Sequence, residues 1–357
     1  MAVSLVSTGV TFPDNSTQTT AATGFGFKNR IINGAMVIDQ RNAGASVTVN
    51  SGVYNYTVDR WFGYGQVADG VFTVQRSTTA PTGFTNSALF TVTTADSSIG
   101  ATQIYGFGQK IEGFNVADLG WGTASAQTVT LSFQVRSSVT GTYSVTLFNS
   151  AFNRGYTATF AVSAANTFET KTITILGDTS GTWLTDNGVG LTLWFSLGTG
   201  STYTGTAGAW NAGTTYGATG QVNLIGTNGA TFYITGVQLE KGSTATSFDY
   251  RPYGTELALC QRYWEKLGGQ NNYDLFIDGY NTSGATLTQN YAFKATKRTN
   301  PTVTFVGTFN YANASMFGLA SGTCNTDSLS AQILITTTGR GYMYSSASGY
   351  ITISAEL

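Results

Sequence analysis

The feature that most constrains this chain is an alternation of apolar and polar residues with a period of two. Between residues 129 and 136 every second residue is apolar: Val129, Leu131, Phe133 and Val135. An extended strand with this pattern has one apolar and one polar face. The alternation recurs at 143–147, 156–162, 173–175 and 231–239, and an apolar run covers 191–197. Glycine- and threonine-rich spacers separate these segments, so the sequence predicts a mainly β protein with an antiparallel β-sandwich.

Two details of the alternation predict local geometry. A turn at 140–142, with the sequence Thr-Gly-Thr, separates the segments 129–136 and 143–147. It predicts that these two strands pair as an antiparallel hairpin. In 231–239 the apolar phase shifts after Ile234, which predicts a β-bulge at Gly236.

One segment has the period of a helix. Between Thr255 and Gly268, four residues recur at helical spacing: Leu257, Cys260, Trp264 and Leu267. Thr255 is the predicted N-cap, and Gly268 is placed where a helix commonly ends. A helix this short is marginal alone, so we expect it to dock. It either closes the base of the following domain or, as we prefer, meets two copies of itself on a threefold axis and forms the trimer interface.

The helix divides the chain into four parts. We predict an N-terminal arm (1–27), a large β-sandwich (28–250), a linker with the helix (251–268) and a small C-terminal β-sandwich, called here the tip domain (269–357). The arm is extended and has too little apolar area to fold alone. We expect a partner to order it through four apolar anchors, which are Val3, Leu5, Val10 and Phe12.

Composition excludes several classes of function. The 357 residues include no histidine, which removes Ser-His-Asp catalysis and histidine-ligated metals. The net charge of −1 provides no basic field for nucleic acid. No apolar stretch is long enough to span a membrane, and no signal peptide is recognisable, so we expect synthesis in a reducing cytoplasm. Cys260 and Cys324 are interpreted as free thiols, although a disulfide between them stays open.

Several short motifs follow one another along residues 8–268. The segments are 10–22, 29–41, 56–61, 108–112, 133–137, 234–242 and 248–253; the second reads Asn29-Arg-Ile-Ile-Asn-Gly-Ala-Met-Val-Ile-Asp-Gln-Arg41. They resemble tail-fibre and receptor-binding proteins of tailed bacteriophages, especially of marine and cyanobacterial phages. The resemblance implies a homotrimer on the outside of the virion that mediates adsorption to the host. The arm would then contact other tail or capsid proteins, and the tip would face the host.

The large domain is also similar to carbohydrate-binding jelly rolls. The likeness lies in Asn33-Gly34 near the first strand and in Val237-Gln-Leu-Glu240 in the closing strand. It implies a jelly-roll sandwich and a glycan on the host surface as the ligand. In such modules a calcium ion often lies between these stretches, so a structural Ca²⁺ held by Asn33, Asp39 and Glu240 stays open.

Glycan binding requires aromatic rings outside the core. Three aromatic residues lie in a glycine- and threonine-rich stretch (198–220) without alternation, and are candidates: Tyr203, Trp210 and Tyr216. Three more alternate with glycine and serine in the tip domain: Tyr342, Tyr344 and Tyr350. The alternatives are packing of the long loop on a neighbouring subunit and packing of the tip residues at a threefold axis. The basic residues Lys294, Lys297 and Arg298 are interpreted as a solvated surface rather than a site for anionic glycan.

Catalysis has little support in the sequence. A glycosidase needs two carboxyl groups held close together, and the acidic residues of the large domain form no such motif; Asp178 and Asp186 stand in turn-like contexts. We therefore expect a structural receptor-binding protein that is not an enzyme and has no cofactor. A capsid-decorating or baseplate protein without receptor binding is the alternative, and a glycan-degrading tailspike is favoured least.

Overall fold

The computed structural model describes residues 4–6, 9–11, 17–18, 28–49 and 51–357. Two of the predicted anchors, Val3 and Phe12, lie outside the described residues. The described part of the arm has three short strands: β1 (Ser4–Val6), β2 (Gly9–Thr11) and β3 (Thr17–Gln18). They form an antiparallel sheet in which Leu5 pairs with Val10.

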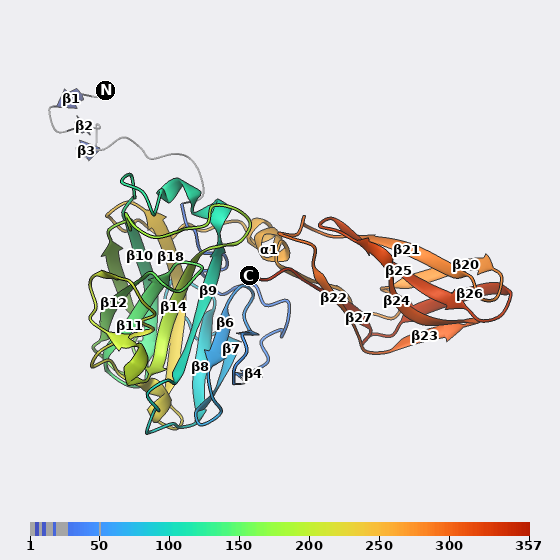
Figure 1. The fold of residues 1–357 in the computed structure, drawn as a ribbon, viewed down its shortest axis with the longest axis horizontal. Coiled ribbons are helices and arrows are strands. Elements are labelled where there is room, and N and C mark those ends of the chain that lie inside the picture. Colours follow the sequence, from blue (N-terminus) through green and yellow to red (C-terminus); the bar gives the residue numbers. More distant parts are fainter. Residues whose placement is uncertain (1–3, 7–8, 12–16, 19–27, 50) are drawn as a thin grey trace.

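Two antiparallel sheets form the large sandwich (Figure 1). The six-stranded sheet has the order β13-β10-β18-β8-β7-β4. Its strands are β4 (Val47–Thr48), β7 (Val71–Ser77), β8 (Ser87–Thr94), β10 (Val129–Ser137), β13 (Glu169–Ile175) and β18 (Thr231–Lys241). The seven-stranded sheet has the order β16-β12-β11-β14-β9-β6-β5. Its strands are β5 (Asn55–Tyr56), β6 (Phe62–Gly65), β9 (Ile104–Glu112), β11 (Gly141–Phe148), β12 (Gly155–Val162), β14 (Val189–Thr199) and β16 (Trp210–Asn211). The predicted mainly β, antiparallel sandwich is confirmed.

Aromatic rings fill the space between the two sheets. Phe107 on β9 stacks on Phe90 of β8 at 3.9 Å and on Phe195 of β14 at 5.1 Å between ring centroids. The apolar residues of the 129–136 alternation all face this core and are buried. Burial of an aromatic side chain stabilises a fold by about 1.5–3 kcal/mol, so these inner faces hold the sandwich together.

The predicted hairpin between β10 and β11 is wrong, whereas the predicted bulge is confirmed. β10 pairs with β13 and β18, and β11 pairs with β12 and β14, so the chain crosses between the sheets at residues 138–140. Both strands have an apolar face, and each buries that face against the opposite sheet; Ser137 Oγ and Tyr143 Oη lie 2.9 Å apart across the core. In β18 the register shifts around Gly236, which has a φ of +60° that suits glycine.

The helix is shorter than predicted and begins earlier. α1 spans Tyr253–Gln261 and follows Pro252, so Thr255 lies inside it instead of capping it. Trp264 and Leu267 belong to strand β19 (Trp264–Gly268), which pairs with β27 (Tyr350–Ser354) far along the sequence. The predicted four-residue helical stripe therefore does not form.

The residues of the expected trimer interface pack inside this chain. Cys260 is 1% exposed and lies with Ile32, Ile38 and Tyr263 in a small core beside the large sandwich. Leu257 packs at the edge of that core, and Leu267 packs against the core of the tip domain. α1 thus joins the two domains of one chain, and the homotrimer stays a prediction. Cys260 and Cys324 are both free thiols.

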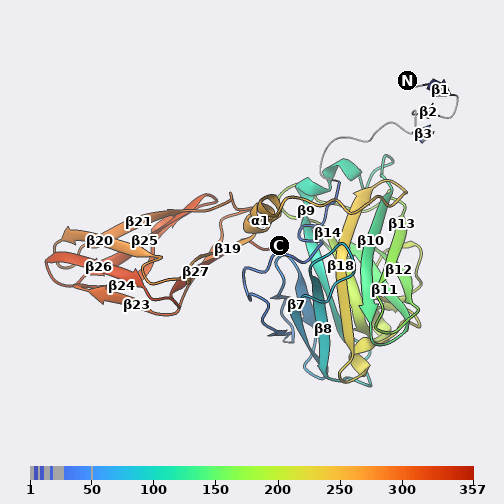
Figure 2. The ribbon, with the colours of Figure 1, turned by 180° about the vertical axis from the view of Figure 1, so that it is seen from behind.

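The tip domain extends from the side of the large sandwich next to α1 (Figures 1 and 2). Its three-stranded sheets have the orders β19-β27-β22, β20-β26-β23 and β21-β25-β24. The remaining strands are β20 (Phe276–Asn281), β21 (Thr286–Ala292), β22 (Thr302–Val306), β23 (Phe309–Ala312), β24 (Ala314–Cys324), β25 (Ser328–Ile335) and β26 (Gly339–Ser345). A separate apolar core, with Ile277, Ile333 and Met343 among its buried residues, lies between them.

Candidate functional site

A small pocket lies on the outer face of the seven-stranded sheet, away from the core. Its volume is about 50 Å³, and six of its eight lining residues are aromatic: Tyr54, Phe62, Tyr64, Ile104, Phe152, Thr192, Trp194 and Tyr216. Strands β6, β9 and β14 and the loops after residues 50, 148 and 211 bring these side chains together. The lining contains no acidic or basic side chain. We call this site the aromatic pocket.

The floor of the aromatic pocket depends on a glycine in the neighbouring strand. Thr192 and Trp194 are two residues apart on β14, so both side chains point to the same face of the sheet. On β9, a Cβ atom added to Gly106 would lie 2.4 Å from Cζ2 of Trp194. The missing side chain at this position leaves the space in which the Trp194 ring lies against the sheet.

Two buried polar atoms of the floor have no hydrogen-bond partner among the described residues. They are Trp194 Nε1, a donor, and Thr192 Oγ1, a donor and acceptor. An unsatisfied buried polar group costs about 1–3 kcal/mol, and most native structures avoid it. Thr192 and Trp194 both line the pocket, so these two polar atoms belong to its lining residues.

The walls are aromatic rings held in mutual contact. The ring centroids of Tyr54 and Tyr64 are 5.1 Å apart, and Tyr64 lies 6.3 Å from Trp194. On the other side, Tyr216 contacts Trp194 edge to face at 5.2 Å, and Tyr203 contacts Tyr216 at 5.6 Å. Burial raises the pKa of Tyr54 and of Tyr216 above the usual value, and neighbouring tyrosines raise both further, so the phenols stay uncharged at neutral pH.

The structure brings together two of the three loop residues predicted to bind glycan. The loop packs on its own domain, because Thr146 and Thr157 each donate a hydrogen bond of 3.1 Å to the carbonyl oxygen of Thr215. Tyr216 therefore lines the aromatic pocket with Tyr203 beside it. Trp210 is elsewhere, in edge-to-face contact with Trp121 and Trp183.

Sequence reasoning missed most of the aromatic pocket. Trp194 belongs to an apolar run whose residues all have the pattern of a core strand. Tyr54 precedes the two-residue strand β5, and Tyr64 lies in the four-residue strand β6, so neither shows clear alternation. One local signal was available. Gly106 and Gly108 alternate within a buried strand, and small residues with that period leave room for a large side chain on a neighbouring strand.

A second aromatic surface lies on the tip domain. Tyr342 and Tyr344 are on the outward face of β26, because Met343 between them points into the core. Tyr273 stacks on Tyr344 at 4.3 Å, and Phe276 lies 6.5 Å from Tyr342. These four rings are called the tip face. Sequence reasoning missed Tyr273 and Phe276, which lie about 70 residues earlier in the chain.

An ion pair lies beside the rings of the tip face. Arg340 and Asp278 form a bidentate ion pair, with both N–O distances at 2.9 Å, and Arg340 lies over the Tyr342 ring at 5.6 Å. Tyr280, which is opposite Arg340 in the sheet, is 78% exposed. Tyr350 is not part of this surface, because it begins β27 and its ring is covered by Lys266 at 4.1 Å.

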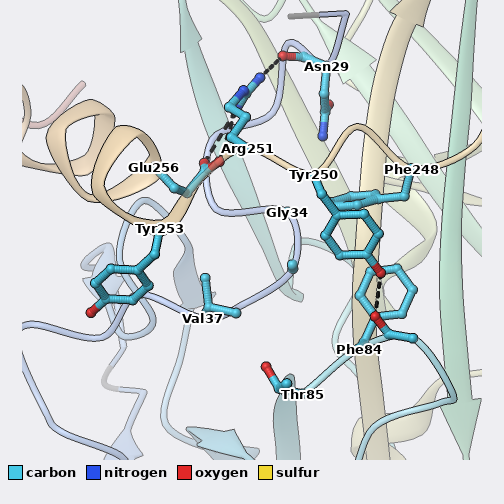
Figure 3. Close-up of a pocket in the computed structure, with 12 residues that line it drawn as sticks. Asn29, Gly34, Val37, Phe84, Thr85, Phe248, Tyr250, Arg251, Tyr253 and Glu256 are labelled. Carbon is cyan, nitrogen blue, oxygen red and sulfur yellow. Dashed lines mark hydrogen bonds and ion pairs between the residues drawn. The ribbon is translucent and has the colours of Figure 1, made fainter.

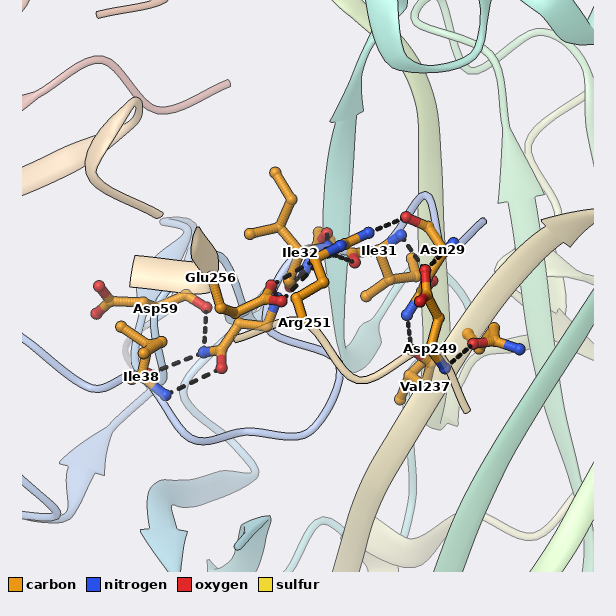
Figure 4. A network of polar contacts seen from close by, with 12 residues as sticks. Asn29, Ile31, Ile32, Ile38, Asp59, Val237, Asp249, Arg251 and Glu256 are labelled. Atoms are coloured by element: carbon orange, nitrogen blue, oxygen red, sulfur yellow. Dashed lines mark hydrogen bonds and ion pairs between the residues drawn. The ribbon is translucent and has the colours of Figure 1, made fainter. Parts of the chain in front are cut away.

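A larger cavity of about 230 Å³ lies at the start of α1 (Figure 3). One wall is a cluster of three rings, Phe84, Phe248 and Tyr250, with centroids 4.8–5.5 Å apart. At the other end Arg251 forms an ion pair with Glu256 and donates to the carbonyl oxygen of Asn29 (Figures 3 and 4). These charged groups connect the start of α1 to residues 29–33, so the polar end of the cavity is occupied by contacts within the chain.

The three residues considered as calcium ligands, Asn33, Asp39 and Glu240, each form hydrogen bonds within the chain. Asn33 donates to the carbonyl oxygens of Ile38 and Asp59. Asp39 accepts hydrogen bonds from the backbone of the following turn, and Glu240 accepts them from Thr246. Within the described ranges, no three acidic or cysteine side chains are grouped so that they would hold a metal ion.

Two of the basic residues interpreted as a solvated surface are structural instead. Lys297 is buried, with Nζ 3.4 Å from Glu265 Oε1. Arg298 donates to the carbonyl oxygens of Ala355 and Glu356. Glu265 neutralises the charge of Lys297, carbonyl oxygens near the end of the chain hold Arg298, and Lys294 alone of the three is exposed.

Comparisons with known proteins find distant structural neighbours. No family model matches the sequence, and no curated protein matches it. A putative sugar-binding protein from Bacteroides thetaiotaomicron overlaps 60% of this chain and 100% of its own, at 14% identity and a TM-score of 0.35. The enzymatically active domain of tailspike protein 4 of bacteriophage CBA120 overlaps 60% of this chain and 21% of its own, at 11% identity and a TM-score of 0.31.

A family 11 carbohydrate-binding module from Clostridium thermocellum, solved with a mixed-linked tetrasaccharide, overlaps 58% of this chain and 100% of its own, at 10% identity and a TM-score of 0.28. All three TM-scores are too low to carry an argument about ligand or activity. In the part of the chain that the structure describes, no helix is both long and apolar enough to cross a membrane.

Proposed function

We propose that this protein attaches to surfaces by binding neutral polysaccharide in the aromatic pocket. The observation that carries the proposal is the combination of aromatic walls with two buried polar atoms, Trp194 Nε1 and Thr192 Oγ1, that lack partners among the described residues. A sugar ring has apolar C–H faces and polar hydroxyl edges. It therefore suits a site with exposed ring faces and a few hydrogen-bonding groups.

The size and charge of the aromatic pocket narrow the ligand. A volume of about 50 Å³ admits a substituent of a sugar, such as a hydroxymethyl group, while the rest of the ring lies on the surrounding tyrosines. The uncharged lining favours a neutral sugar over a sulfated or carboxylated one. It also contains no carboxyl pair for glycosidic cleavage, which supports binding without turnover.

The tip face would add a second, weaker contact with the same surface. Tyr273 and Phe276 are exposed, and Tyr342 and Tyr344 are partly exposed on the outward face of β26, so the four rings form a surface patch rather than a recess. Linking two weak sites in one chain raises the overall avidity without a strong single site.

The sequence motifs support a place for this protein on a phage virion. Their resemblance to tail-fibre and receptor-binding proteins supports a homotrimer outside the particle, with residues 1–27 on other tail or capsid proteins. Three chains would multiply the two sugar contacts. Light scattering of the purified protein would give three times the chain mass if this proposal holds, whereas the mass of a single chain would contradict it.

The sugar-binding proposal is tested by titration calorimetry with the full-length protein and three neutral hexasaccharides: cellohexaose, xylohexaose and maltohexaose. We expect one of them to bind. Trp194→Phe keeps a ring but removes the Nε1 donor and should weaken binding about tenfold, equivalent to about 1.4 kcal/mol. Trp210→Phe is the matched control outside the pocket and should leave the affinity unchanged. Binding of none of the three, or equal losses in both variants, would contradict the proposal.

A further inference from the structure

We infer that the C-terminal segment of the tip domain holds the wall residue Tyr54 of the aromatic pocket in place, and that Lys110 is the positioning residue that connects the two. The inference rests on the proposed function for its effect on sugar binding. Its structural basis is independent of that function, because it concerns how the wall residue Tyr54 is held.

The segment that leaves the tip domain is anchored on the large domain. Glu356, which follows β27, forms ion pairs with Arg41, at 2.5 Å, and with Arg60. All three side chains are largely buried. Arg298 holds the same segment from the other side through the carbonyl oxygens of Ala355 and Glu356, each at 3.0 Å. In Figures 1 and 2 the C-terminus accordingly lies beside the large sandwich rather than at the far end of the tip.

This anchored segment presents an acceptor to the seven-stranded sheet. The carbonyl oxygen of Leu357 accepts a hydrogen bond from Tyr56 Oη at 2.9 Å and another from Lys110 Nζ at 3.0 Å. Lys110 belongs to β9 of the large domain, whereas Leu357 belongs to the segment that leaves the tip domain. The hydrogen bond between them therefore connects the two domains.

Lys110 connects this acceptor to the aromatic pocket. Its Nζ lies 4.1 Å from the centroid of the Tyr54 ring, within the range of a cation–π interaction. Burial, with Arg60 and Arg298 nearby, lowers the pKa of Lys110 to about 8, so the amine is still mostly charged at pH 7. The hydrogen bond to Leu357 fixes the position of Lys110 Nζ. The cation–π interaction then holds the Tyr54 ring in place.

Tyr54 depends on such a contact more than the other wall residues do. It is 43% exposed and lies in the loop before the two-residue strand β5. Its other ring contacts are with Phe62 at 4.9 Å and Tyr64 at 5.1 Å. Trp194 and Phe62, by contrast, are buried within strands. Loss of the cation would therefore release Tyr54 before any other part of the pocket.

The test compares three variants of the full-length protein. Lys110→Met keeps the length of the side chain but removes its charge, whereas Lys110→Arg keeps both charge and donors. Lys266→Met is the matched control, because Lys266 covers the Tyr350 ring at the same distance of 4.1 Å within the tip domain. We expect Lys110→Met to weaken binding of the hexasaccharide about fivefold. Lys110→Arg and Lys266→Met should bind as the wild type does.

A second readout does not depend on sugar binding. Hydrogen exchange followed by mass spectrometry should show faster exchange of residues 51–57 in Lys110→Met and in Glu356→Gln, which frees the tip segment, but not in Lys266→Met. Unchanged exchange at 51–57 in both variants would overturn the inference. If Trp194→Phe weakens binding and Lys110→Met does not, the proposed function stands and this inference falls. If no hexasaccharide binds, the exchange measurement alone decides.

Discussion

The aromatic pocket and the tip face use the same side chains in opposite ways. In the pocket, rings surround a recess whose floor contains buried polar atoms, whereas on the tip face the rings lie open beside an exposed ion pair. A recess with hydrogen-bonding groups discriminates between ligands, because a wrong substituent leaves those groups unpaired. An open patch of rings tolerates many ligands that have an apolar face. Under the proposed function, the aromatic pocket would be the selective site of this chain and the tip face the permissive one.

The aromatic pocket and the tip face should differ most in the unfolding free energy that is lost when one ring is removed from each. Trp194→Ala removes a side chain that is 2% exposed, so the large domain should lose about 3–5 kcal/mol of unfolding free energy. Tyr344→Ala removes a partly exposed ring and should cost less than about 1 kcal/mol. Urea denaturation of both variants measures the difference. Similar losses would show that the tip face is as much part of a core as the pocket floor is.

A matched pair of glycines gives the next largest effect. In Gly106→Ala the new Cβ would lie 2.4 Å from both the Trp194 ring and the carbonyl oxygen of Phe195, so backbone has to move. We expect a cost of about 1–3 kcal/mol and a weaker sugar site. In Gly279→Ala of the tip domain, the nearest atom is the end of the Leu287 side chain at 3.0 Å, and the cost should be smaller. Thermal unfolding and titration calorimetry of both variants test this ranking.

Acid should distinguish the ion pair between Glu112 of the large domain and Arg262 of the linker, whose carboxylate is buried, from the exposed ion pair on the tip. Burial acts to raise the pKa of Glu112, but hydrogen bonds from Arg262 and Tyr263 outweigh it and hold that pKa below its usual value of 4.5. The carboxylate therefore contributes stability above pH 4.5 that is lost as the pH falls through the lower folded value. Arg262→Met should flatten the decrease in thermal stability between pH 5 and pH 3.

The exposed pair provides the control for that experiment. Arg340 also lowers the pKa of Asp278, but water screens this pair on the tip face. Arg340→Met should therefore leave the pH profile of unfolding unchanged. An equal change of the pH profile in both variants would contradict the view that only the Glu112–Arg262 pair is sheltered from water.

The smallest effect concerns binding by the tip face alone. Tyr342→Ala combined with Tyr344→Ala should leave hexasaccharide titration in the aromatic pocket unaltered. The double variant should weaken retention on an insoluble form of the same polysaccharide about two- to threefold, because avidity falls when one of two linked contacts is lost. Depletion measurements with washed polysaccharide particles detect a change of this size. Loss of hexasaccharide binding would show that the two surfaces are not separate.

Features that depend on neighbours in sequence were predictable, and those that depend on distant partners were not. The bulge at Gly236 followed from the strand's own pattern, as did the common face of Tyr342 and Tyr344. The end of α1 did not, because Trp264 pairs with Ser354, 90 residues later, and that pairing overrides the helical spacing. The 140–142 turn was recognisable, but a turn alone does not decide whether the next strand pairs within its sheet or crosses to the other.

The candidate site illustrates the same limit. Tyr203 and Tyr216 were found because their loop lacks alternation, whereas Trp194 was hidden within an apolar run that reads as core on both faces. Its role emerges only where Gly106 on a neighbouring strand leaves space for the ring. Likewise, the tip face gains Tyr273 and Phe276 only after strands far apart in the sequence have paired.

The return of residues 355–357 to the large sandwich has a mechanical consequence. A module connected by a single strand of peptide acts as a swivel, free to rotate when it is pulled. Here two connections lie next to each other: the backbone before β19, and the ion pairs of Glu356 with Arg41 and Arg60. Together they resist rotation of the tip domain about the large sandwich. Under a pulling force, the orientation of the tip domain relative to the large sandwich would therefore stay fixed.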